Sequence, residues 1–82
     1  MMPVVHLNGT AREELFEQYL SAGHALQAAL EAMVRASPNG RDYYPSGPDA
    51  FMEAQDRWDD LMKNVREAYL ECQITAEYVA DQ

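Results

Sequence analysis

The residues best suited to chemistry form a short polar stretch within positions 37–47. An arginine holds a phosphate or carboxylate through two parallel N–H donors. A tyrosine ring stacks on a nucleobase, and Asn or Asp side chains read polar ring edges or ribose hydroxyls. The stretch therefore predicts a ligand-binding loop; alternatively, its tyrosine rings close the end of a hairpin core and its Asn and Asp form turns. The candidate residues are Asn39, Arg41, Asp42, Tyr43 and Tyr44.

A second polar segment, near the N-terminus, contains His6 and Asn8. In one helical hairpin this arm and the loop lie a helix length apart, about 39 Å at 1.5 Å per residue. Two antiparallel hairpins would bring the arm of one copy to the loop of the other. We therefore expect a composite pocket between copies, in which His6 and Asn8 join Arg41 and Tyr43 or Tyr44.

The sequence offers no catalytic constellation. Neither His6 nor His24 has a second ligand three or four residues away, the spacing that a helical metal site uses. Cys72 occupies an apolar heptad position, where a thiol behaves as a small hydrophobic side chain. No glycine-rich phosphate loop is present. We expect a protein that is not an enzyme and that uses no metal or cofactor.

The charge balance restricts the partners. The 82 residues include 14 acidic and 6 basic side chains, a net charge of −8, which repels nucleic acids and anionic membranes. No apolar run approaches the roughly 20 residues of a membrane span, and no secretory signal is recognisable. A single cysteine is consistent with a reducing compartment. We expect a cytoplasmic protein with no direct nucleic-acid or membrane binding, whose acidic residues either keep it soluble or imitate a phosphate array.

Two helices must position these residues. Residues 10–13 match a capping box, and apolar residues recur at helical spacing until Pro38, which predicts a helix over about 11–36. A second helix over about 48–79 begins after a cap at Ser46 or Gly47. We expect an all-α protein: one antiparallel helical hairpin domain over 1–82, with an extended arm at 1–9 and an irregular loop at 37–47. The second helix carries two interleaved heptad series: Phe51, Trp58, Val65, Cys72 and Val79, and Ala54, Leu61, Ala68 and Thr75.

The chain has more apolar residues than one helix–helix seam uses. Leu70, Ile74 and Tyr78 form a second stripe on the second helix. Gly23, in the seam of the first helix, costs about 1 kcal/mol relative to alanine unless a neighbouring chain packs close to it. A chain this short buries a marginal core by itself. We therefore expect a homo-oligomeric helical bundle, most simply a dimer, with these four residues at the interface.

The segments HLNGT (6–10) and NGRDYYP (39–45) resemble a family of short proteins encoded by tailed bacteriophages and prophages, for which no activity is established. The resemblance extends over nearly the whole chain, with arm, helix, loop and second helix in the same order. It implies an accessory factor that blunts immunity in the cytoplasm of an infected bacterium.

By analogy with helical proteins that bind signals between protomers, the resemblance further implies sequestration of a nucleotide-derived immune signal of the cyclic dinucleotide or cyclic ADP-ribose type. In this interpretation Arg41 pairs with phosphate and Tyr43 or Tyr44 stacks on a base. Two alternatives stay open. One is an acidic inhibitor that binds a host defence complex, and the other is a minor structural or assembly protein of the virion.

Overall fold

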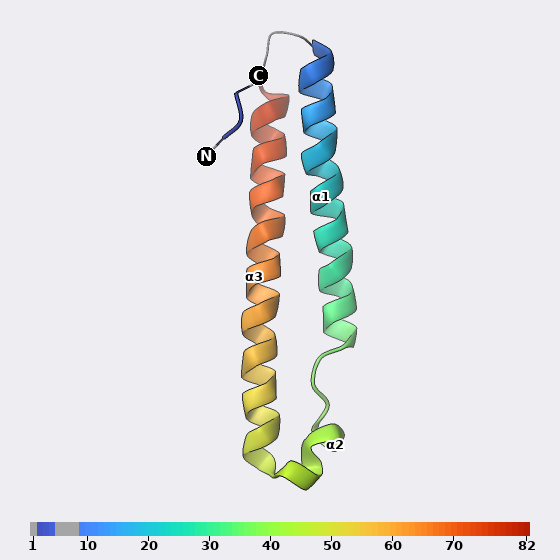
Figure 1. The fold of residues 1–82 in the computed structure, drawn as a ribbon, viewed down its shortest axis with the longest axis vertical. Coiled ribbons are helices and arrows are strands. Elements are labelled where there is room, and N and C mark those ends of the chain that lie inside the picture. The colour runs from blue at the N-terminus through green and yellow to red at the C-terminus, as the bar shows by residue number, and fades with distance from the viewer. Residues whose placement is uncertain (1, 5–8) are drawn as a thin grey trace.

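The fold, in a computed structural model that describes residues 2–4 and 9–82, is a helical hairpin with a short helical linker. It consists of α1 (Gly9–Arg35), α2 (Gly40–Tyr43), the 3-10 helix η1 (Tyr44–Ser46) and α3 (Pro48–Ala80). The two long helices lie side by side and antiparallel, and residues 2–4 lie at the same end of the long axis as the C-terminus (Figure 1). The predicted hairpin is confirmed, and its long helices begin and end within two residues of the predicted positions.

The seam between α1 and α3 contains the first heptad series of α3 and six residues of α1: Phe16, Tyr19, Gly23, Leu26, Leu30 and Met33. On α1 the seam side chains are partly buried and Gly23 is fully buried; on α3 burial is complete at Val79, which is 0% exposed. The second predicted series is wrong in its middle, because Leu61 and Ala68 are exposed. A different series takes that place, made of the residues four positions after Trp58, Val65 and Cys72. Its members are Met62, Tyr69 and Ala76.

A hydrogen bond from α3 anchors the C-terminal end of α1. The Trp58 Nε1–H donates to the carbonyl oxygen of Met33 at 2.9 Å, and the Ser37 hydroxyl donates to the same oxygen at 3.3 Å. The last carbonyls of a helix lack the full set of partners within the helix; the Met33 oxygen also accepts the Ala36 backbone N–H at 3.2 Å, so the two side chains add donors to a carbonyl at the helix end. Trp58 therefore ties the end of α1 to α3.

The predicted irregular loop is wrong, because residues 40–46 form α2 and η1. Asn39 starts α2: its side-chain oxygen accepts the Arg41 backbone N–H at 3.0 Å. Gly47 ends η1 and precedes α3 with φ 92° and ψ 166°, a conformation open essentially to glycine alone. Local capping and one glycine thus make the linker regular despite its prolines.

The hairpin is one helical layer thick. Its extents are 61 × 20 × 12 Å and its radius of gyration is 18.2 Å, whereas a compact chain of this length has about 12 Å. Its accessible surface is 6348 Å², against about 5,000 Å² for a compact monomer of this mass. Of the described apolar side chains, only Ala76 and Val79 are buried. No helix in the described residues is both long and apolar enough to cross a membrane.

Candidate functional site

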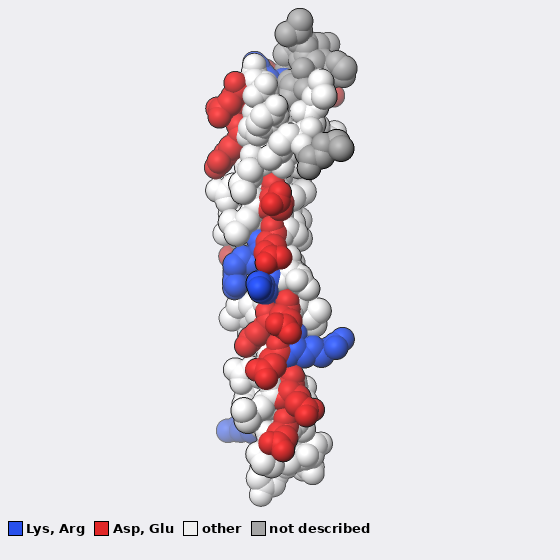
Figure 2. Space-filling view, turned by 90° about the vertical axis from the view of Figure 1, so that its left-hand side faces the viewer, with Lys and Arg blue, Asp and Glu red and all other residues white. Residues whose placement is uncertain are grey.

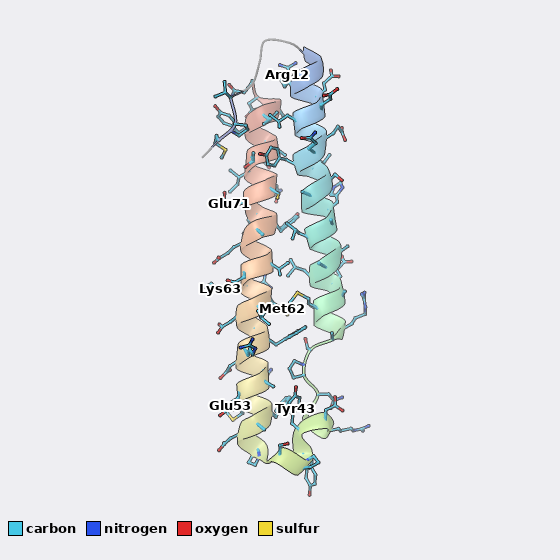
Figure 3. All side chains as sticks on the ribbon, in the orientation of Figure 1. Arg12, Tyr43, Glu53, Met62, Lys63 and Glu71 are labelled. Atoms are coloured by element: carbon cyan, nitrogen blue, oxygen red, sulfur yellow. The ribbon has the colours of Figure 1, made fainter. Side chains whose placement is uncertain are left out.

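The two tyrosines at the hairpin tip have different roles. The Tyr43 ring is partly buried, with its centroid 6.3 Å from that of Phe51 and the ring planes inclined by 47°. Figure 3 shows Tyr43, the last residue of α2, at the tip of the hairpin. Tyr43 therefore closes the end of the hairpin core. Tyr44, the next residue, is 86% exposed and makes no such contact with the core.

A surface hollow of about 420 Å³ lies next to Tyr44. Glycine, proline, aromatic and methionine residues line it, so it suits a flat apolar ring better than a charged group. The lining residues are Gly40, Tyr43, Tyr44, Gly47, Pro48, Phe51 and Met52. The predicted polar residues Asn39, Arg41 and Asp42 are exposed and stand outside this lining, and the Asn39 side-chain oxygen is engaged in capping α2.

The remaining predicted ligand-binding residues, His6 and Asn8, lie outside the described residues. The described part of the arm borders another hollow, of about 320 Å³, where Pro3 and Val4 face Ala11 and Leu15 of α1. This hollow is at the end of the hairpin that contains the chain termini, opposite the tip (Figure 1). One copy of the chain therefore does not bring residues 3–4 to the tip.

Sequence reasoning missed a third hollow, of about 260 Å³, on one side of the hairpin near Gly23. Aromatic rings and polar side chains from both long helices line it, among them Phe16, Tyr19, Tyr69, His24 and Gln27. Its sequence signal is a glycine within an otherwise bulky seam. Gly23 is buried, and a Cβ there would lie 3.7 Å from the Cβ of Cys72 in the same chain. Gly23 therefore packs inside the hairpin of one chain, and its place at an oligomer interface stays a prediction.

The other predicted interface residues are on the surface of α3. Leu70 is 46% exposed, Ile74 48% and Tyr78 39%. Acidic side chains follow one another along the outward side of α3, with basic side chains among them (Figure 2). We call six exposed residues on this side the acidic stripe: Asp49, Glu53, Asp56, Asp60, Glu67 and Glu71.

No protein-family model, curated protein or solved structure matches this chain. Within the described residues, no group of three or more His, Cys, Asp or Glu side chains is arranged to hold a metal ion. The arrangement at the tip can stack a planar ring on Tyr44 and offer one guanidinium to an anion.

Proposed function

We propose that the protein is a homo-oligomeric accessory protein of a tailed bacteriophage that binds and sequesters a small nucleotide-derived immune signal. The observation that carries the proposal is the exposure of Tyr44, which is 86% exposed. It lies beside an apolar hollow and three residues along the chain from the exposed Arg41. A large aromatic side chain held in a short helix but left in solvent is ready to stack on a ligand ring. The resemblance of residues 6–10 and 39–45 to phage proteins supplies the biological context.

Each tip residue has a distinct role in this proposal. Tyr44 stacks on a base that lies over the hollow, and Arg41 forms paired hydrogen bonds with a phosphate. Asp42 accepts hydrogen bonds from ring N–H groups or ribose hydroxyls, and Tyr43 positions Tyr44 through its packing on Phe51. A net charge of −8 repels an anion at long range. The binding energy therefore comes from these short-range contacts.

The test is depletion of a probe from solution. Purified protein is mixed with a cyclic dinucleotide, such as cyclic di-AMP, or with cyclic ADP-ribose, and the filtrate of an ultrafiltration membrane is measured. We expect the protein to retain at least one probe, and Arg41→Ala and Tyr44→Ala to abolish retention. Arg66→Ala is the matched control, because Arg66 is also an exposed cation but lies far along α3 from the tip. Complete recovery of every such probe in the filtrate would contradict the proposal.

The acidic stripe favours a second candidate function, inhibition of a basic host complex by imitation of nucleic acid. Its six carboxylates follow one side of a 33-residue helix, a regular array that a basic channel attracts electrostatically. This candidate predicts that the protein competes with DNA for a purified DNA-binding defence complex. The variant Asp56→Asn/Asp60→Asn should lose this competition, while Arg41→Ala and Tyr44→Ala should retain it.

A further inference from the structure

One broad side of the hairpin is uncharged along both long helices. On α1 and the turn after it, this side presents the exposed Ala22, Ala29 and Ala36. On α3 it presents the partly buried Ala54 and the exposed Leu61 and Ala68. Residues seven apart keep nearly the same side of a helix. Ala22 and Ala29 come one position before the seam residues Gly23 and Leu30, and the α3 residues come four positions before seam residues. Both offsets turn away from the seam in the same rotational direction. Because the two helices are antiparallel, the same direction of rotation from the seam leads to the same broad side of the hairpin. We call this side the pairing face.

The hairpin needs a second layer of helices. Its surface exceeds that of a compact monomer by about 1,300 Å², and a stable interface of ordinary size buries about 800 Å² on each partner. A face about 20 Å wide on a molecule 61 Å long can supply that area. Domains with a dry core have at least two packed layers, and this chain provides one.

The charges decide which side is covered by another copy. The outward side of α3 carries the acidic stripe, so two copies meeting there would bring like charges together. The opposite broad side carries Asp59 and Arg66, each one position after a seam residue. The pairing face has only small or apolar side chains, which let helices approach to the lower end of the usual 8–10 Å spacing.

We propose that a second copy of the chain packs antiparallel on the pairing face. The two-fold axis lies between the two copies and crosses the hairpin at the level of Ala29 on α1 and Asn64 on α3. Asn64 is the midpoint of α3 (Pro48–Ala80), so with the axis at this level the α3 helices of the two copies overlap along their full length. Gly23 lies beside Cys72, and the Met33 carbonyl accepts a hydrogen bond from Trp58. Between these two pairs, the antiparallel register puts Ala29 at the same level as Asn64. Ala22 and Ala36, seven residues on either side of Ala29, then face each other across the axis.

Charge complementarity at the edge of this face supports the same axis. Arg57 and Glu71, the acidic-stripe residue next to the pairing face, are exposed and lie seven residues before and after Asn64. Each comes one position before a seam residue. The two-fold axis therefore sets Arg57 of each copy opposite Glu71 of the other, and Leu61 near Ala68. A parallel arrangement would leave these opposite charges unmatched.

This inference rests on the homo-oligomer of the proposed function and deepens it. Antiparallel pairing puts the tip of one copy beside the terminal end of the other, where Pro3 and Val4 border Ala11 and Leu15. Pro3 and Val4 of the partner copy then lie beside the tip hollow and complete the side that a single chain leaves open. Each dimer has two such composite sites, one at each end.

The first experiment measures mass in solution, by light scattering after size exclusion, for Ala29→Glu and the matched variant Ala28→Glu. Both alanines are exposed on α1, and both variants gain the same charge, but Ala28 is on the back of the helix, away from the pairing face. We expect a dimer or a multiple of it for the wild type and Ala28→Glu, and monomers for Ala29→Glu. Circular dichroism checks that Ala29→Glu is still helical.

The second experiment reverses the edge charges and does not depend on tolerance of a buried charge. Arg57→Glu and Glu71→Arg should each raise the dimer dissociation constant about tenfold, since both symmetric contacts become repulsive. The double variant Arg57→Glu/Glu71→Arg should return to within about threefold of the wild type.

Single variants that do not weaken the dimer, or a double variant that does not recover, would overturn the pairing face. An oligomer that survives Ala29→Glu but is lost in Leu70→Glu would overturn it as well and leave the proposed oligomer intact. A monomeric wild type would contradict both the proposed pairing face and the oligomeric part of the proposed function. Retention of a cyclic nucleotide by that monomer would still support ligand binding.

Discussion

Replacement of Gly23 by alanine should stabilise the hairpin, although Gly23 is buried between the two long helices. A glycine in a helix interior costs about 0.8–1.0 kcal/mol relative to alanine. The added Cβ would lie 3.7 Å from the Cβ of Cys72 and 4.0 Å from the Tyr69 ring, which are ordinary van der Waals distances. No neighbour has to move, and burial of the methyl group contributes up to about 0.8 kcal/mol more. We expect a gain of about 1–1.5 kcal/mol in the free energy of unfolding.

The measurement is thermal unfolding followed by circular dichroism at one fixed chain concentration, because self-association shifts the melting temperature. A gain of 1 kcal/mol raises the melting temperature of a domain this size by about 4–8 °C. Ala25→Gly, at an exposed position of α1, is the control and should lose about 1 kcal/mol through helix propensity alone. A lower melting temperature for Gly23→Ala would refute the reasoning, because it would mean that α1 and α3 are too close at this position to accept a methyl group.

The remaining predictions concern the ends of the helices and the tip. Trp58→Phe removes the hydrogen bond to the Met33 carbonyl and should lower the free energy of unfolding by about 1 kcal/mol in urea. Gly47→Ala should cost about 1–3 kcal/mol by the same measurement; nothing lies within 4 Å of the new Cβ, so an unchanged stability would show that φ 92° is not required. Tyr43→Ala should lose about 1–3 kcal/mol and Tyr44→Ala less than about 0.5 kcal/mol; equal losses would contradict their different packing. Higher ionic strength should speed the association of an anionic probe in stopped-flow measurements, because salt screens the net charge of −8; a slower rate would contradict this.

The helical hairpin follows from the sequence, because its determinants are local. Apolar residues at helical spacing and Pro38 placed α1, and Pro48 after Gly47 placed the start of α3. The linker was the exception: its prolines and glycines indicated an irregular loop. The Asn39 side chain instead caps α2 and allows a helical turn there.

Tertiary structure decided how the long helices are rotated against each other. Two heptad series on α3 flank the same line of residues, and sequence spacing alone does not say which one faces α1. The structure turns Met62 and Tyr69 inward and leaves Ala68 exposed. The same rotation buries Gly23 against its own chain and leaves Leu61 of the other series exposed as well.

The candidate site was recognisable by residue type and not by arrangement. Arg41, Tyr43 and Tyr44 stood out in the sequence as possible ligand contacts. Only the fold separates Tyr43, which packs on Phe51, from Tyr44, which remains in solvent. The physical reason is that helical periodicity is a property of neighbouring residues, whereas the burial of a side chain depends on which distant residue packs against it.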